Sequence, residues 1–150
     1  MQAVAVEARV PEPSTGGALL SELQAAHADL TLAIAAMARV TARPMIDIGD
    51  YTRVRWHLTR ASRARRRVIE RALDALAHRA APADAALLRR LRADDIAAVR
   101  NSSAHIYKWP LEAVKADWSG YGRASALIRS RMRQRIEEEQ AHLVPLLARY

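Results

Sequence analysis

The C-terminal part of the chain carries the feature that most constrains its fold, an acidic residue in the middle of an apolar helical stripe. At about 100° per residue, one helix face collects the apolar side chains of Ile128, Met132, Ile136, Leu143, Leu146 and Leu147. Glu139 falls in the middle of that face. A carboxylate that faces an apolar core is costly unless it is paired or binds a metal. The pattern therefore predicts a helix that runs to the C-terminus and a partner for Glu139 on a neighbouring element.

Three more segments show the same spacing of apolar residues, residues 18–40, 51–78 and 83–107. In the last of these, Leu88, Leu91, Val99 and Ile106 are expected to line the inner face. Residues 110–117 predict a short helix with proline at its first position, and residues 118–122 predict a turn. The chain is 51% hydrophobic with few runs of β-branched residues, which favours helices over sheet.

We therefore expect an all-α fold, an up-down-up-down four-helix bundle over residues 18–150 with a short extra helix between the third and fourth. Asp50 is expected to cap the second helix. Residues 1–17 contain two prolines and two glycines, and are expected to form a flexible tail.

Each long helix places one polar residue in its apolar stripe, namely His27, Arg65, Asp95 and Glu139. At a rise of about 1.5 Å per residue, these four positions fall within roughly two turns of one another along the bundle. A guanidinium that faces a core needs a carboxylate partner with good geometry. The four side chains are thus predicted to share one layer of the core.

Two segments resemble the hemerythrin-like (HHE cation-binding) family. Residues 23–30, LQAAHADL, are similar to its first-helix element, with His27 at a ligand position. Residues 135–146, RIEEEQAHLVPL, are similar to its fourth-helix element, with Glu139 at the position of a carboxylate ligand. Members of this family are four-helix bundles with a di-iron centre, so the resemblance implies that fold over about residues 18–150.

The other ligand positions of the family pattern are changed. Arg135 and Asp95 stand where histidines are expected, and Ala61 and Arg65 occupy the His and Glu positions of the second helix. Because Arg65 can supply the positive charge that iron would supply, we predict a metal-free ionic cluster of His27, Arg65, Asp95 and Glu139, with no cofactor. The competing interpretation is a site for iron or another divalent metal held by His27, Asp95 and Glu139.

No Ser/His/Asp arrangement, glycine-rich phosphate loop or His-Glu-x-x-His motif is found, so we predict no catalytic residues and a regulatory or binding role. A signalling alternative comes from residues 104–108, AHIYK, which resemble the core of histidine phosphotransfer domains and make His105 a candidate phosphoacceptor. There Trp109 and Pro110 follow, where those domains continue the helix.

The formal net charge of +8 raises the question of a nucleic-acid partner. A basic ridge on the second helix is the candidate surface, made of Arg53, Arg60, Arg63, Arg67 and Arg71. We prefer a solvated face for it, and leave open an unknown protein partner or a homodimer. No apolar run approaches the ~20 residues of a membrane span, and the N-terminus lacks a basic region followed by an apolar one. The cytoplasm is therefore the expected compartment, with no membrane partner.

Overall fold

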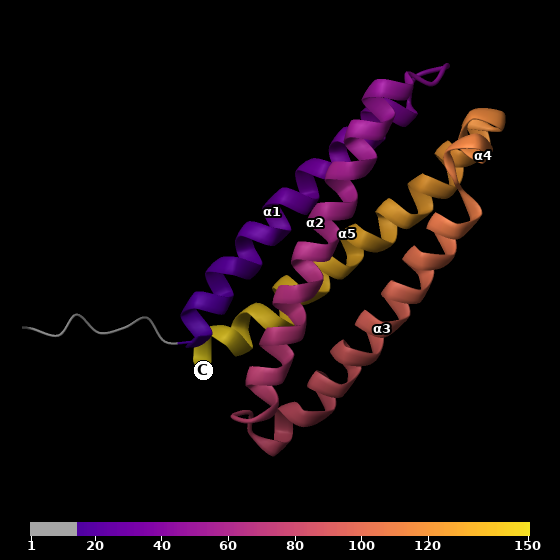
Figure 1. Cartoon of the computed structure of the whole chain (residues 1–150). Helices are drawn as coiled ribbons and strands as arrows, with labels where there is room; N and C mark the ends of the chain where they lie inside the picture. Colours follow the sequence, from indigo (N-terminus) through magenta and orange to yellow (C-terminus); the bar gives the residue numbers. More distant parts are fainter. Residues whose placement is uncertain (1–14) are drawn as a thin grey trace, which may run out of the picture.

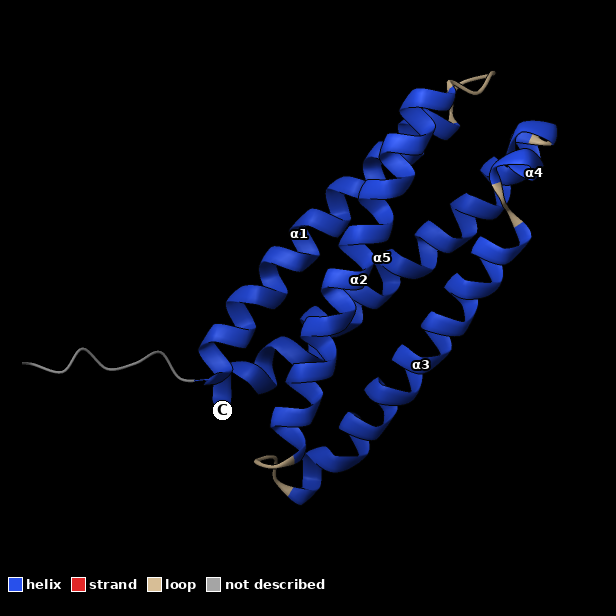
Figure 2. Ribbon diagram, viewed as in Figure 1, coloured by secondary structure: helices blue, strands red, loops and turns tan. Residues whose placement is uncertain are grey.

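The computed structural model describes residues 15–150, and they are helical with no strand (Figure 2). Four long helices and a short one follow each other along the chain, with a 3-10 turn before the third long helix. The elements are α1 (Thr15–Thr41), α2 (Ile48–Ala77), η1 (Pro82–Asp84), α3 (Ala85–Lys108), α4 (Leu111–Ala116) and α5 (Trp118–Arg149). The predicted fold class is confirmed. None of these helices has the length and apolar character needed to cross a bilayer.

The helices pack side by side in antiparallel order (Figure 1). Helices α1 and α2 form the most extensive pair, α5 packs against α1, and α3 lies between α2 and α5 on the other side of the bundle. The short α4 sits at the end where α3 finishes and α5 begins. The C-terminal end of α5 lies beside the start of α1, where a Cβ on Gly16 would come within 2.5 Å of the Tyr150 carbonyl carbon.

The apolar core is shared mainly by α1, α2 and α5. Its largest cluster fills the end at which α1 begins, and an aromatic cluster with Tyr51, Trp109 and Tyr121 fills the end near α4. A small cluster around Leu30 and Ile136 lies between them. The only buried residues of α3 within the described chain are Leu88, Leu91 and Asp95, all in its first half. Helix α3 itself therefore buries side chains in its first half only, and Trp109, just beyond its last residue, joins the aromatic cluster.

The second half of α3 differs from the sequence-based expectation. Ile106, expected on the inner face, is 52% exposed, and Val99 is only half-buried. Three consecutive polar residues, 101–103, interrupt the apolar character of this half, so little apolar area is gained by closing it onto α2 and α5.

Two helix starts also differ from the predicted ones, because an aspartate one turn away caps each helix. The side chain of Asp47, rather than Asp50, caps α2 by accepting a hydrogen bond from the Asp50 amide at 3.0 Å. Residues 118–122, predicted to form a turn, are the first turn of α5. There the Asp117 side chain accepts from the Gly120 amide at 2.9 Å, a position where a Cβ would collide with the Asp117 carboxylate.

The predicted flexible tail, residues 1–17, lies outside the described residues except for its last three. Those three form the beginning of α1. The predicted start of the third long helix at residue 83 falls instead in η1, because Pro82 opens a 3-10 turn before α3.

Candidate functional site

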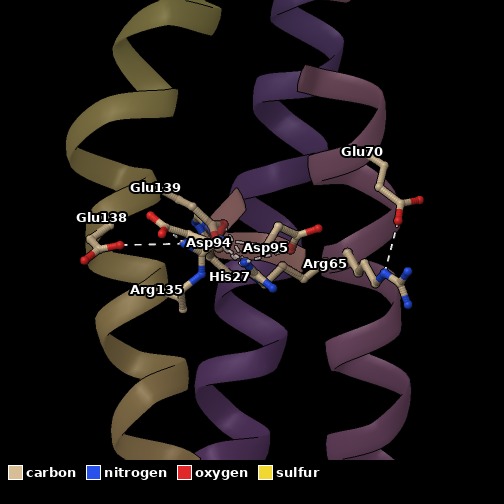
Figure 3. A network of polar contacts seen from close by, with 9 residues as sticks. His27, Arg65, Glu70, Asp94, Asp95, Arg135, Glu138 and Glu139 are labelled. Carbon is tan, nitrogen blue, oxygen red and sulfur yellow. Dashed lines mark hydrogen bonds and ion pairs between the residues drawn. The ribbon is translucent and has the colours of Figure 1, made fainter. Parts of the chain in front are cut away.

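Glu139 lies at the centre of a buried polar layer, and both of its oxygens are bonded (Figure 3). It projects from α5 and is 1% exposed. His27 Nε2 on α1 donates to Oε2 at 3.0 Å, and Arg65 Nε on α2 donates to Oε1 at 2.9 Å. Arg65 Nη2 also hydrogen-bonds Oε1. Three helices therefore meet through one carboxylate.

Local sequence explains why Glu139 and Arg65 are buried. On α5, Glu139 lies one turn from buried Ile136 and one turn from buried Leu143. On α2, Arg65 lies between buried Ala61 and Val68 in the same way. Apolar layers thus cover the ionic groups on both sides, which strengthens their mutual attraction.

Asp95 on α3 joins the layer through charge rather than through a hydrogen bond. Arg65 Nη2 lies 3.8 Å from Asp95 Oδ1, and that buried oxygen has no hydrogen-bond partner among the described residues. His27 and Asp95 do not contact each other in the described chain, and Glu139 and Arg65 connect them. The structure thus brings His27, Arg65, Asp95 and Glu139 together in one layer.

Arg135 is a fifth member that the sequence reasoning did not include. Its Nη2 lies 4.0 Å from both Asp95 Oδ1 and Glu139 Oε1, and its Nη1 lies 3.6 Å from Asp94 Oδ2 and 3.7 Å from Glu138 Oε2. None of these approaches is a hydrogen bond, and its buried Nε and Nη1 have no hydrogen-bond partner in residues 15–150. Its place one helical turn before Glu139 was the signal that could have found it.

The pKa values of the two carboxyl groups of the layer shift in opposite directions. Burial alone would raise the pKa of Glu139, but the hydrogen bond from His27 and the charge of Arg65 outweigh burial and hold that pKa below its ordinary value. For Asp95 burial wins over the attraction of Arg65 and Arg135, so its pKa is raised. Glu139 is thus the stably charged acid, and Asp95 is the acid that the layer leaves poorly compensated.

The geometry suits a guanidinium better than a metal ion. Arg65 bonds Glu139 and lies within an ion-pair distance of Asp95, so a cation placed among His27, Asp95 and Glu139 would meet a fixed positive charge. Across the part of the chain that the structure describes, no group of three or more His, Asp or Glu side chains is arranged to hold a metal. The residues present do not fit the di-iron centre that the family resemblance implies.

The candidate phosphoacceptor lies apart from this layer. His105 is half-buried near the end of α3, and its ring packs 5.8 Å from that of Tyr121. Burial, with Arg55 and Lys108 nearby, lowers the pKa of His105.

The candidate basic ridge on α2 is partly neutralised. Arg53 pairs with Asp50 at 2.9 Å and Arg71 pairs with Glu22 on α1. The Arg60 guanidinium lies over the ring of Trp56, an exposed aromatic that the sequence reasoning did not assign to this surface.

Comparisons with protein-family models, with curated proteins and with solved structures return no match to this chain.

Proposed function

We propose that this protein is a cytoplasmic, non-catalytic bundle of the hemerythrin-like type, in which an ionic cluster occupies the place where the family holds iron. In this proposal the cluster is structural, and the role of the protein is to bind a regulatory ligand or partner. The support from sequence is the similarity of residues 23–30 and 135–146 to two family elements.

The observation that carries the proposal is the saturation of Glu139. A carboxylate that ligates a metal needs a free lone pair, but His27 and Arg65 place four hydrogen bonds on the two oxygens of Glu139. Metal binding there would have to displace the guanidinium of Arg65, which would then lose its buried acceptor. Such a loss is costly because an unpaired charge remains in the core.

Metal analysis of protein purified without chelators tests this proposal. We expect substoichiometric iron, manganese and zinc, and no change in the thermal midpoint after incubation with each ion. Glu139→Gln tests the candidate ligand, and Glu138→Gln on the same helix is the matched control. One metal ion per chain that is retained by the parent and by Glu138→Gln, but lost in Glu139→Gln, would replace the proposal with the metal-binding alternative.

A further inference from the structure

A cleft of about 490 Å³ lies between α2, α3 and α5, and extends from the ionic cluster toward the α4 end of the bundle. Its walls run from Arg65 to Arg55 on α2, from Asp95 to Ile106 on α3, and along the facing side of α5. The cleft lies beside the second half of α3, in which no residue is fully buried. Its volume falls in the range of about 300–1,000 Å³ that is usual for small-molecule sites.

The middle of the cleft is apolar. Leu58, Val99, Ile128 and Met132 line it from three helices. The hydroxyl of Ser62 also belongs to the lining, is buried, and has no hydrogen-bond partner among residues 15–150. An unpaired buried hydroxyl is unfavourable, and a polar atom of a ligand would satisfy it.

The charges of the lining are only partly paired with one another. Its three acids, Asp94, Asp95 and Glu138, all lie at the cluster end, where Arg65 and Arg135 face them. Apart from these two arginines and Arg66, which pairs with Glu70, the lining contains three more arginines. None of these three arginines forms an ion pair with these acids in the described chain.

Those three arginines lack acidic partners. Arg55 donates only to neutral acceptors, the Tyr51 hydroxyl and the Trp109 carbonyl oxygen, the latter at 2.8 Å. Arg63 and Arg131 stand on the exposed rim and make no ion pair within the described chain. Such a cleft offers free cations above an apolar floor.

We propose that this cleft binds a small organic anion with an apolar body. The acid group meets Arg131 and Arg63 at the rim, and the body packs against Leu58, Ile128 and Met132. A helix from a protein partner fits less well, because its apolar face would cover these guanidinium groups without a counter-charge. The inference rests on the binding role proposed above and names the class of ligand.

A pair of fluorescent probes on the full chain tests the inference. 8-Anilinonaphthalene-1-sulfonate is an aromatic anion, and N-phenyl-1-naphthylamine is its neutral counterpart. We expect one sulfonate probe per chain, and binding at least about tenfold weaker in Arg131→Gln, because a charge-assisted contact is lost. The neutral probe should bind Arg131→Gln and the parent equally. Arg133→Gln is the matched control, since Arg133 is an exposed arginine on α5 outside the cleft lining.

A second variant tests the location without changing charge. Ala98→Trp fills the cleft from α3 and should abolish binding of both probes. If its far-ultraviolet circular dichroism shows loss of helix, Arg131→Gln alone decides the result, since that residue is exposed. Equal binding of the sulfonate by the parent and Arg131→Gln, or binding of several probes per chain unaffected by Ala98→Trp, overturns the inference. These outcomes do not depend on the metal content of the protein. Failure of the probes to bind as expected would therefore leave the ionic-cluster proposal intact, and a metal found in the core would leave the result of the probe experiment intact.

Discussion

Replacing Arg65 with alanine tests the buried layer most directly. The substitution removes the guanidinium donors from Glu139, which is 1% exposed and would keep only the hydrogen bond from His27. Asp95 would lose its closest cation and keep the weaker approach of Arg135, at 4.0 Å. Removing one partner of a buried ion pair costs about 3–5 kcal/mol, because an uncompensated charge stays behind. For a chain of this size, such a loss lowers the thermal midpoint by roughly 6–20 °C.

Urea and thermal unfolding, followed by circular dichroism, measure this loss. The matched control is Arg66→Ala at the neighbouring position, where the arginine is exposed and pairs with exposed Glu70, so a change of at most about 0.5 kcal/mol is expected. Glu139→Ala should be destabilised to a similar extent as Arg65→Ala, and the double variant by less than the sum of the two. An unfolding free energy of Arg65→Ala within about 0.5 kcal/mol of Arg66→Ala would refute the reasoning.

Two further predictions follow from the buried charges. Arg129 is buried with its Nη1 unpaired in the described chain, and burial lowers its pKa. Arg129→Met should therefore leave the free energy of unfolding unchanged or raise it by about 1 kcal/mol. A decrease of about 1 kcal/mol in the free energy measured by urea unfolding would contradict this prediction. The pKa shifts of Glu139 and Asp95 predict opposite dependences of the unfolding free energy on pH, between about pH 3 and pH 7. Because the folded pKa of Glu139 is lowered, its contribution is present at neutral pH and is lost as the pH falls through that value, so Glu139→Gln should be most destabilised relative to the parent at neutral pH. Because the folded pKa of Asp95 is raised, its contribution to stability is present at low pH and is lost as the pH rises through that value. Asp95→Asn should therefore gain stability relative to the parent toward neutral pH. Parallel curves of unfolding free energy against pH for the two variants would contradict both pKa shifts.

The helical fold could be predicted because its determinants are local and periodic. The spacing of apolar residues predicts four long helices, and the fixed rise per residue places His27, Arg65, Asp95 and Glu139 at similar heights from the sequence alone. The height of a residue along a helix follows from the helix geometry alone, so it can be predicted without knowing how the helices pack.

The predictions that failed depend on competition between local signals. Residues 118–122 contain two glycines and a serine, which favour a turn, but the Asp117 side chain caps the amide of Gly120 and the helix starts there. Arg135 is noted from sequence only as standing where a histidine is expected, because its approaches to Asp94 and Asp95 depend on how α3 packs against α5, which periodicity does not give. The cleft could not be predicted, because periodicity places Ile106 on the inner face of α3 and cannot weigh that gain against the polar residues 101–103.

The ionic cluster around Glu139 also fixes how the helices are aligned along their axes. Leucine and alanine side chains of one layer can often replace those of the next, so an alanine- and leucine-rich bundle has neighbouring alignments of similar energy. Sliding α5 by one turn would move Glu139 by about 5.4 Å, away from both His27 and Arg65 at once. The cluster thus selects a single register among α1, α2 and α5. This register also fixes which residues of α2 and α5 face each other across the neighbouring cleft.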